Sequence, residues 1–274
     1  MAALGRIVGP VPFKDVVQKE EDEHPPEEYA DIIATLPSIT TGFGPLLCYQ
    51  GVWLRPWMVP GVIAVQRHLA PRPGDVLLAS PPKCGTTWLK ALSLATMVRA
   101  TYPPSGADDP LLRLNPHDCV PHLEALFSAG QEAKLEALPR RRLPLLRSVR
   151  VCIWDHILGY LRAKKASPER VLFLRYEEML LDPVSSVLGV PFTAGFAHGH
   201  LQAVQHRHDE RHLEANNTGV AGLFVEVPHQ SFFRKGVVGE GEGHWANHMT
   251  PEMARRIDAI VEDKLRGSGL SFTR

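Results

Sequence analysis

The segment from Asp75 to Ala91, DVLLASPPKCGTTWLKA, constrains the fold more than any other part of this chain. A short apolar run is followed by two prolines, a lysine, a glycine and two threonines, and then by a helical pattern of apolar residues. This order predicts a buried strand over Val76–Ser80, a tight loop, and a helix over Thr86–Ala100. The first N–H groups of a helix and the positive end of its dipole favour an anion, above all a phosphate. We therefore expect the loop to bind the phosphate of a nucleotide.

The side chains of the loop fit this expectation. Lys83 supplies a mobile positive charge, Thr86 and Thr87 supply hydroxyl donors, and Gly85 lets the backbone approach a ligand closely. Cys84 lies between them, where a small residue fits the turn. The loop is not a Walker motif, which needs a glycine, four residues and then Gly-Lys-Ser/Thr. A nucleotide kinase is therefore the weaker hypothesis, and an ordinary helix start after a proline-rich loop is the structural alternative.

Composition excludes several classes of protein. The chain has 274 residues, enough for one α/β domain or two small ones. It has 30 basic and 30 acidic residues, and this balance does not favour binding to nucleic acid. No apolar run is as long as a membrane span, and the N-terminus lacks a secretory core. The four cysteines are far apart, which is typical of reduced thiols in the cytoplasm rather than of disulfides or a zinc site.

The rest of the chain suggests one long domain after an N-terminal tail. Residues 1–45 are acidic and interrupted by prolines, so we expect a mostly disordered tail with one short helix at most. Residues 46–274 alternate strand and helix patterns, which predicts a parallel sheet flanked by helices on both faces, an α/β fold. Besides the strand and helix around the loop, we expect helices at Pro60–His68, Pro121–Ala137 and Trp154–Lys165, and strands at Val149–Ile153 and Val171–Leu174. We also expect a C-terminal helix with Thr250 as its N-cap, Pro251 as its first residue and Gly267 after its last turn.

One connection in this pattern is unusually short. The strand pattern VRVCI, Val149–Ile153, runs almost directly into the helix that begins at Trp154. Loops from a strand to a helix in α/β units usually have about 2–6 residues. Ligands of open parallel sheets bind at the carboxyl ends of the strands. The chain therefore lacks a loop where ligand contacts normally lie.

The C-terminal third carries two other candidate sites. Arg234 and Lys235 stand beside Gly236, which predicts either a second phosphate site or an exposed basic turn. His208 and His212 have the i, i+4 spacing of two metal ligands on a helix. The acidic residue in HDERH stands one position too late for the zinc motif HExxH, so a divergent loop is the favoured interpretation and we expect no metal.

Four blocks of the sequence, in order, resemble one enzyme family. PPKCGTTWLKAL is similar to the 5′-phosphosulfate-binding loop of cytosolic sulfotransferases. The blocks LRLNPHDCVPHLE, WDHILGYLRAKKASPERVLFLRYEEMLLDP and FFRKGVVG resemble further blocks of that family. The plant branch, which includes flavonol and steroid sulfotransferases, is the best match. The resemblance spans about Leu46 to Phe272.

The resemblance implies a P-loop-like fold and the transfer of a sulfonate group. The donor would be 3′-phosphoadenosine 5′-phosphosulfate, and the acceptor a hydroxyl of a small apolar molecule. Lys83 would be catalytic, because it would stabilise the charge that grows on the bridging oxygen as the S–O bond breaks. Trp88 would face the adenine, and Arg234, Lys235 and Gly236 would hold the 3′-phosphate. The donor-binding residues implied by the family are Lys83, Cys84, Gly85, Thr86, Thr87, Trp88, Tyr176, Arg234, Lys235 and Gly236.

The chain also departs from the family at places that carry chemistry. The family has a loop with an arginine and a serine after the strand that matches VRVCI, at the same short connection. Its catalytic histidine precedes that strand, but the matching residues here, 136–150, contain no histidine. His117 and His122 are the remaining candidate bases. Two hypotheses stay open: an active sulfotransferase, and a relative that binds the donor or product nucleotide without turnover.

Overall fold

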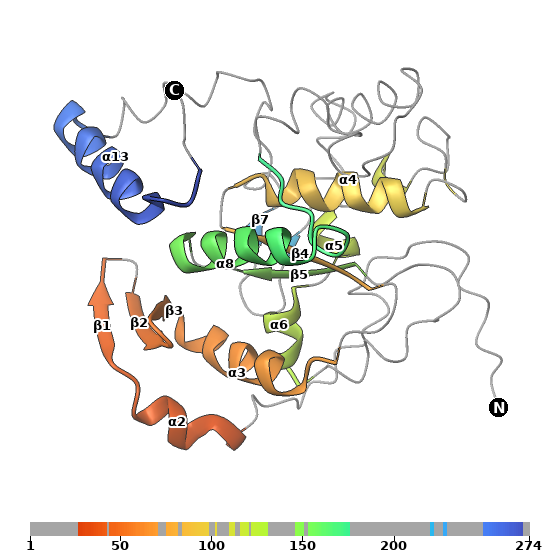
Figure 1. Ribbon diagram of the computed structural model, residues 1–274. Coiled ribbons are helices and arrows are strands. Elements are labelled where there is room, and N and C mark those ends of the chain that lie inside the picture. The colour runs from red at the N-terminus through yellow and green to blue at the C-terminus, as the bar shows by residue number, and fades with distance from the viewer. Residues whose placement is uncertain are drawn as a thin grey trace. The chain divides into compact units, whose positions relative to one another are not determined.

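The computed structural model describes residues 27–42, 44–70, 75–81, 84–98, 102, 110–112, 116–120, 122–130, 146–150, 153–175, 220–221, 227–228 and 249–270 (Figure 1). The chain forms two compact units, residues 1–150 with 193–233 and residues 151–192 with 234–274. Strands and helices are mixed in the first unit, and its β4–β5 pair is parallel, as in an α/β fold. In this described part of the chain, none of the helices has the length and apolar character needed to cross a membrane.

The first unit opens with a small antiparallel sheet. Its strands are β1 (Ser38–Thr41), β2 (Gly44–Tyr49) and β3 (Val52–Leu54), in that order. Gln50 and Gly51 connect β2 to β3, and both have a positive φ, 50° and 80°, as a two-residue type I′ turn requires. Strand β2 crosses the expected tail boundary at residue 45, so the regular structure begins earlier than the sequence suggests. Strand β1 is mostly exposed and therefore shows no apolar alternation that would reveal it.

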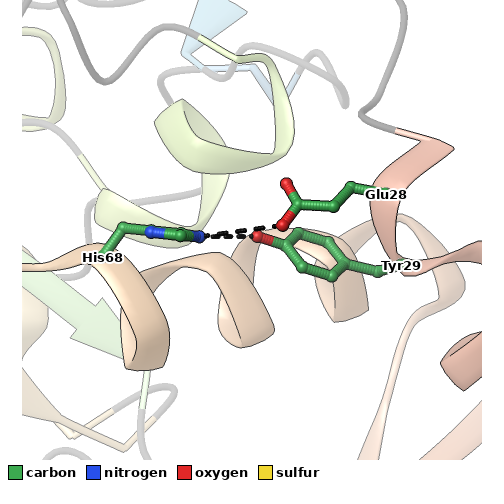
Figure 2. A network of polar contacts seen from close by, with 3 residues as sticks. All are labelled: Glu28, Tyr29 and His68. Carbon is green, nitrogen blue, oxygen red and sulfur yellow. Dashed lines mark hydrogen bonds and ion pairs between the residues drawn. The ribbon is translucent and has the colours of Figure 1, made fainter.

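Tyr29 anchors the segment before this sheet. It belongs to a short 3₁₀ turn, η1 (Glu27–Tyr29), which leads into α2 (Ala30–Ala34), and only 1% of its surface is exposed. Its hydroxyl lies 3.0 Å from Nε2 of His68, and a carboxylate oxygen of Glu28 lies 4.0 Å from the same nitrogen (Figure 2). The guanidinium of Arg67 lies 5.3 Å from the Tyr29 ring centroid, a cation–π distance. These contacts hold residues 27–34 against the end of helix α3.

Helices α3 (Val59–His68) and α6 (Leu123–Ser128) form the first core of this unit. A 3₁₀ turn, η2 (Pro56–Met58), leads into α3, and Pro60 occupies its first turn, where proline is tolerated. The predicted helix at residues 60–68 is confirmed. Helix α6 covers only part of the predicted helix at 121–137, because Gly130 follows it with a φ of 65°, and residues 131–137 lie outside the described part. The buried core residues are Tyr29, Val59, Ile63, Ala64, Leu123, Leu126 and Phe127.

The second core of this unit lies beside a parallel strand pair. Strand β4 (Val76–Ser80) pairs with β5 (Leu146–Arg150) along its full length, and α4 (Thr86–Val98) follows β4. The predicted strand 76–80 and the predicted helix starting at Thr86 are confirmed, although the first two residues of β4 are exposed. Two short elements, η3 (Pro110–Leu112) and α5 (Pro116–Cys119), complete this region. The buried core residues are Leu78, Ala91, Leu94, Ala95, Val98, Leu111 and Val120.

Two predicted strands differ from the structure. Strand β5 ends at Arg150, so the predicted strand at 149–153 lies three residues too late, and α8 (Ile153–Ala166) already begins at Ile153. An apolar run such as VCI suits a strand and the first turn of a helix equally well, so periodicity cannot show where the strand ends and the helix begins. Residues 171–174 form no strand, and no described strand pairs with them. The connection from β5 to α8 has two residues, as short as the sequence suggests.

The second unit contains α8 and the C-terminal helix α13 (Pro251–Leu265). The predicted helix at 154–165 is confirmed, and so are the predicted ends of the C-terminal helix. The Thr250 hydroxyl accepts a hydrogen bond from the Met253 N–H at 3.2 Å, and Gly267 follows the helix with a φ of 75°. Within the first unit, β6 (Val220–Ala221) and β7 (Val227–Pro228) form a short antiparallel pair.

Candidate phosphate-binding site

The loop between β4 and α4 lies at the carboxyl ends of the two parallel strands. Ser80, the last residue of β4, is paired with Arg150, the last residue of β5. The loop that follows Ser80 and the short connection that follows Arg150 therefore leave the sheet at the same edge. Open parallel sheets bind their ligands at this edge. The short connection noted in the sequence therefore begins beside the candidate phosphate loop.

Hydrogen bonds close the loop between the strand and the helix. The Cys84 N–H donates to the Pro81 carbonyl at 3.3 Å, and the hydroxyls of Ser80 and Thr86 lie 2.7 Å apart. The Thr86 hydroxyl also lies 3.5 Å from the Pro81 carbonyl oxygen. Ser80 is 7% exposed, so the hydrogen bond between the Ser80 and Thr86 hydroxyls is largely shielded from water. The Thr86 side chain therefore ties the start of α4 to the end of β4.

Gly85 sets the entry into helix α4. Its φ is 78°, a left-handed value that favours glycine. Its carbonyl accepts from the Leu89 N–H at 2.9 Å, which begins the helical ladder. The first N–H groups of a helix have no acceptor within the helix, so those that open α4 at Thr86 are geometrically suited to an anion. The described half of the loop thus leads through a left-handed glycine directly into the first turn of α4.

Thr87 points to a different partner from Thr86. Its hydroxyl oxygen lies 2.9 Å from Nε2 of His117 in helix α5. His117 is half-buried, and its other ring nitrogen, Nδ1, lies 3.3 Å from Nζ of Lys90. Thr87 and Lys90 are three residues apart in α4, so they share one face of the helix. This face joins the candidate phosphate loop to a polar cluster in the protein interior.

Lys90 is the centre of that cluster and has no exposed surface. Its Nζ lies 2.8 Å from the Val120 carbonyl oxygen and 3.1 Å from Nε2 of His122, in addition to the contact with His117. The two imidazole rings stack with centroids 5.7 Å apart. An ammonium group has three hydrogens and no lone pair, so it can donate to each of these acceptors. A buried charge is tolerated when it is satisfied in this way.

These contacts determine whether His117 or His122 can act as a general base. Each imidazole uses a ring nitrogen to accept a hydrogen bond from Lys90. A neutral imidazole has only one nitrogen with a lone pair. Neither His117 nor His122 can therefore take a proton from an acceptor hydroxyl without breaking its bond to Lys90. By sequence both histidines are candidate bases, but their contacts with Lys90 make both poorly suited to that role.

The structure describes half of the predicted site residues. Cys84, Gly85, Thr86, Thr87 and Trp88 lie together at the turn into α4, with Cys84 exposed and the others half-buried. Five predicted residues lie outside the described part: Lys83, Tyr176, Arg234, Lys235 and Gly236. His208 and His212, whose spacing allows a metal site although a divergent loop is the favoured interpretation, also lie outside it, and the described residues include no group of three metal-ligating side chains.

The sequence analysis did not single out Lys90. Its signal was present, because this lysine stands in the apolar stripe of α4, directly before the buried residues 91–96. Lysine is almost never fully buried unless its charge is paired. A lysine in such a stripe therefore predicts a buried partner. The identity of that partner could not be read from the sequence, since His117 lies 27 residues away.

Comparison with known proteins identifies the family. The model of the sulfotransferase domain matches residues 73–151 and 147–269. The chain is 31% identical to cytosolic sulfotransferase 11 of Arabidopsis thaliana, over 92% of this chain and 90% of that protein. It is 34% identical to cytosolic sulfotransferase 4 of the same plant, over 90% and 94%. The chain belongs to the sulfotransferase family, whose reaction is the transfer of a sulfonate group.

A solved structure supports the fold. An Arabidopsis thaliana protein thought to be a steroid sulphotransferase superposes with a TM-score of 0.62 and 23% identity, over 89% of this chain and 94% of that one. The two segments matched by the family model meet at residues 147–151. This is where β5 ends and the two-residue connection to α8 begins. The break in the family match therefore coincides with the short connection between β5 and α8.

Proposed function

We propose that this protein transfers the sulfonate group of 3′-phosphoadenosine 5′-phosphosulfate to a hydroxyl of a small apolar acceptor, such as a flavonoid, a steroid or another phenol, in the cytoplasm. The observation that carries the proposal is the loop from Ser80 to Trp88, which opens a helix at the carboxyl end of a parallel strand. In this proposal the sheet is P-loop-like with helices on both faces, and residues 46–274 form the catalytic domain. The names of the plant relatives support the chemistry and the compartment.

The residues would divide the work as follows. The first N–H groups of α4 and the Thr87 hydroxyl would hold the 5′-phosphate, and Lys83 would face the oxygen that bridges phosphorus and sulfur. The acceptor oxygen attacks sulfur and loses its proton to water, the bond from sulfur to the bridging oxygen breaks, and negative charge grows on that oxygen. A cation aimed at this charge stabilises the transition state, and one such donor is worth roughly 2.7–4 kcal/mol in comparable sites. Trp88 and Tyr176 would contact the nucleotide, and Arg234, Lys235 and Gly236 would bind its 3′-phosphate.

A second function, nucleotide binding without turnover, is favoured by a specific set of observations. Only two residues separate β5 from α8, at the edge of the sheet where the phosphate loop lies. Residues 136–150 contain no histidine, and Lys90 occupies the accepting nitrogens of His117 and His122. Loss of a general base typically lowers the rate by about 10²–10⁴. Such a protein would still bind the donor or its product.

Two assays on the full chain test these proposals together. The first measures the melting temperature with 3′-phosphoadenosine 5′-phosphate, because a ligand that binds only the folded state stabilises it. The second follows the label from a labelled donor to flavonoid and steroid hydroxyls. A rise in melting temperature with transfer supports the sulfotransferase, and a rise without transfer supports the non-catalytic binder. No rise at millimolar ligand would overturn both.

A transcript sequence offers an independent check of the second function. If a longer transcript restores a loop at Cys152–Ile153, the longer product should transfer sulfonate and the present chain should not. If the longer product is equally inactive, the missing loop does not explain the loss of activity.

A further inference from the structure

We draw no further inference here: the strongest candidate, the exposed apolar stripe of Met253, Ile257 and Ile260 along helix α13, carries none, because nothing in the described part of the structure shows what covers it.

Discussion

Gly61 offers the sharpest test of how the first unit is packed. It lies in the first turn of α3, against α6. A methyl group on Gly61 would overlap the Glu124 carbonyl oxygen and the Ser128 hydroxyl, and would lie 2.8 Å from the Glu124 carbonyl carbon. These obstacles are backbone and a buried serine rather than the end of a flexible side chain. Gly61→Ala must therefore push the two helices apart.

The expected loss of stability follows from three contributions. Overpacking of a core contact typically costs about 1–3 kcal/mol. The Gly61 N–H donates to the Ser128 hydroxyl at 2.8 Å, and losing this bond costs about 1 kcal/mol. Alanine stabilises a helix by about 1 kcal/mol relative to glycine, which offsets the loss of the hydrogen bond to Ser128. We expect a net destabilisation of about 1–3 kcal/mol, which lowers the melting temperature by about 2–4 °C per kcal/mol.

Gly159→Ala is the matched control for this substitution. Gly159 lies inside α8, is exposed, and has nothing within 4 Å of an added methyl group. The same change should therefore stabilise the protein by up to about 1 kcal/mol. Urea denaturation followed by far-UV circular dichroism measures the free energy of unfolding of both variants. The packing described for α3 and α6 is refuted if Gly61→Ala is as stable as the wild type.

Three further substitutions have expected outcomes. Ser128→Ala should lower the free energy of unfolding by about 1 kcal/mol, because the buried hydroxyl accepts from Gly61 N–H and donates to the Trp57 carbonyl at 3.0 Å; an unchanged urea midpoint would contradict this. Thr250→Ala should cost about 1 kcal/mol and speed hydrogen exchange in the first turn of α13, whereas equal exchange rates would mean that the cap contributes nothing. Lys83→Ala should lower the turnover of a labelled donor by about 10²–10³, and unchanged turnover would remove Lys83 from the mechanism.

Local signals in the sequence predict much of the fold. Pro60 marks the first turn of α3, and Thr250 and Pro251 mark the start of α13, because caps and first-turn residues act within a few positions. Strand β5 could not be placed as well, since its register depends on pairing with β4, about 70 residues earlier. The segment 171–174 has a strand's composition without a described partner, and β1 has a partner without a strand's apolar pattern.

The candidate site, like the fold, can be predicted from the sequence only where its signals are local. The order of prolines, Gly85 and the two threonines is local, so the sequence predicts the loop and the helix that follows it. The different roles of Thr86 and Thr87 depend on Ser80 and on His117 in another element, and no spacing rule connects Thr87 to His117. The resemblance to the family supplies residue roles, whereas the hydrogen bonds of Lys90 come only from the structure.

The central claim is that the turn into α4 binds the phosphate end of the nucleotide. The most direct measurement is the ¹H–¹⁵N spectrum of the full chain during a titration with 3′-phosphoadenosine 5′-phosphate, with ATP as the comparison. We predict that the amide signals of Gly85, Thr86, Thr87 and Trp88 shift together and saturate with the adenosine bisphosphate at concentrations where ATP has little effect. Unchanged signals from these four amides at saturating ligand would contradict the claim.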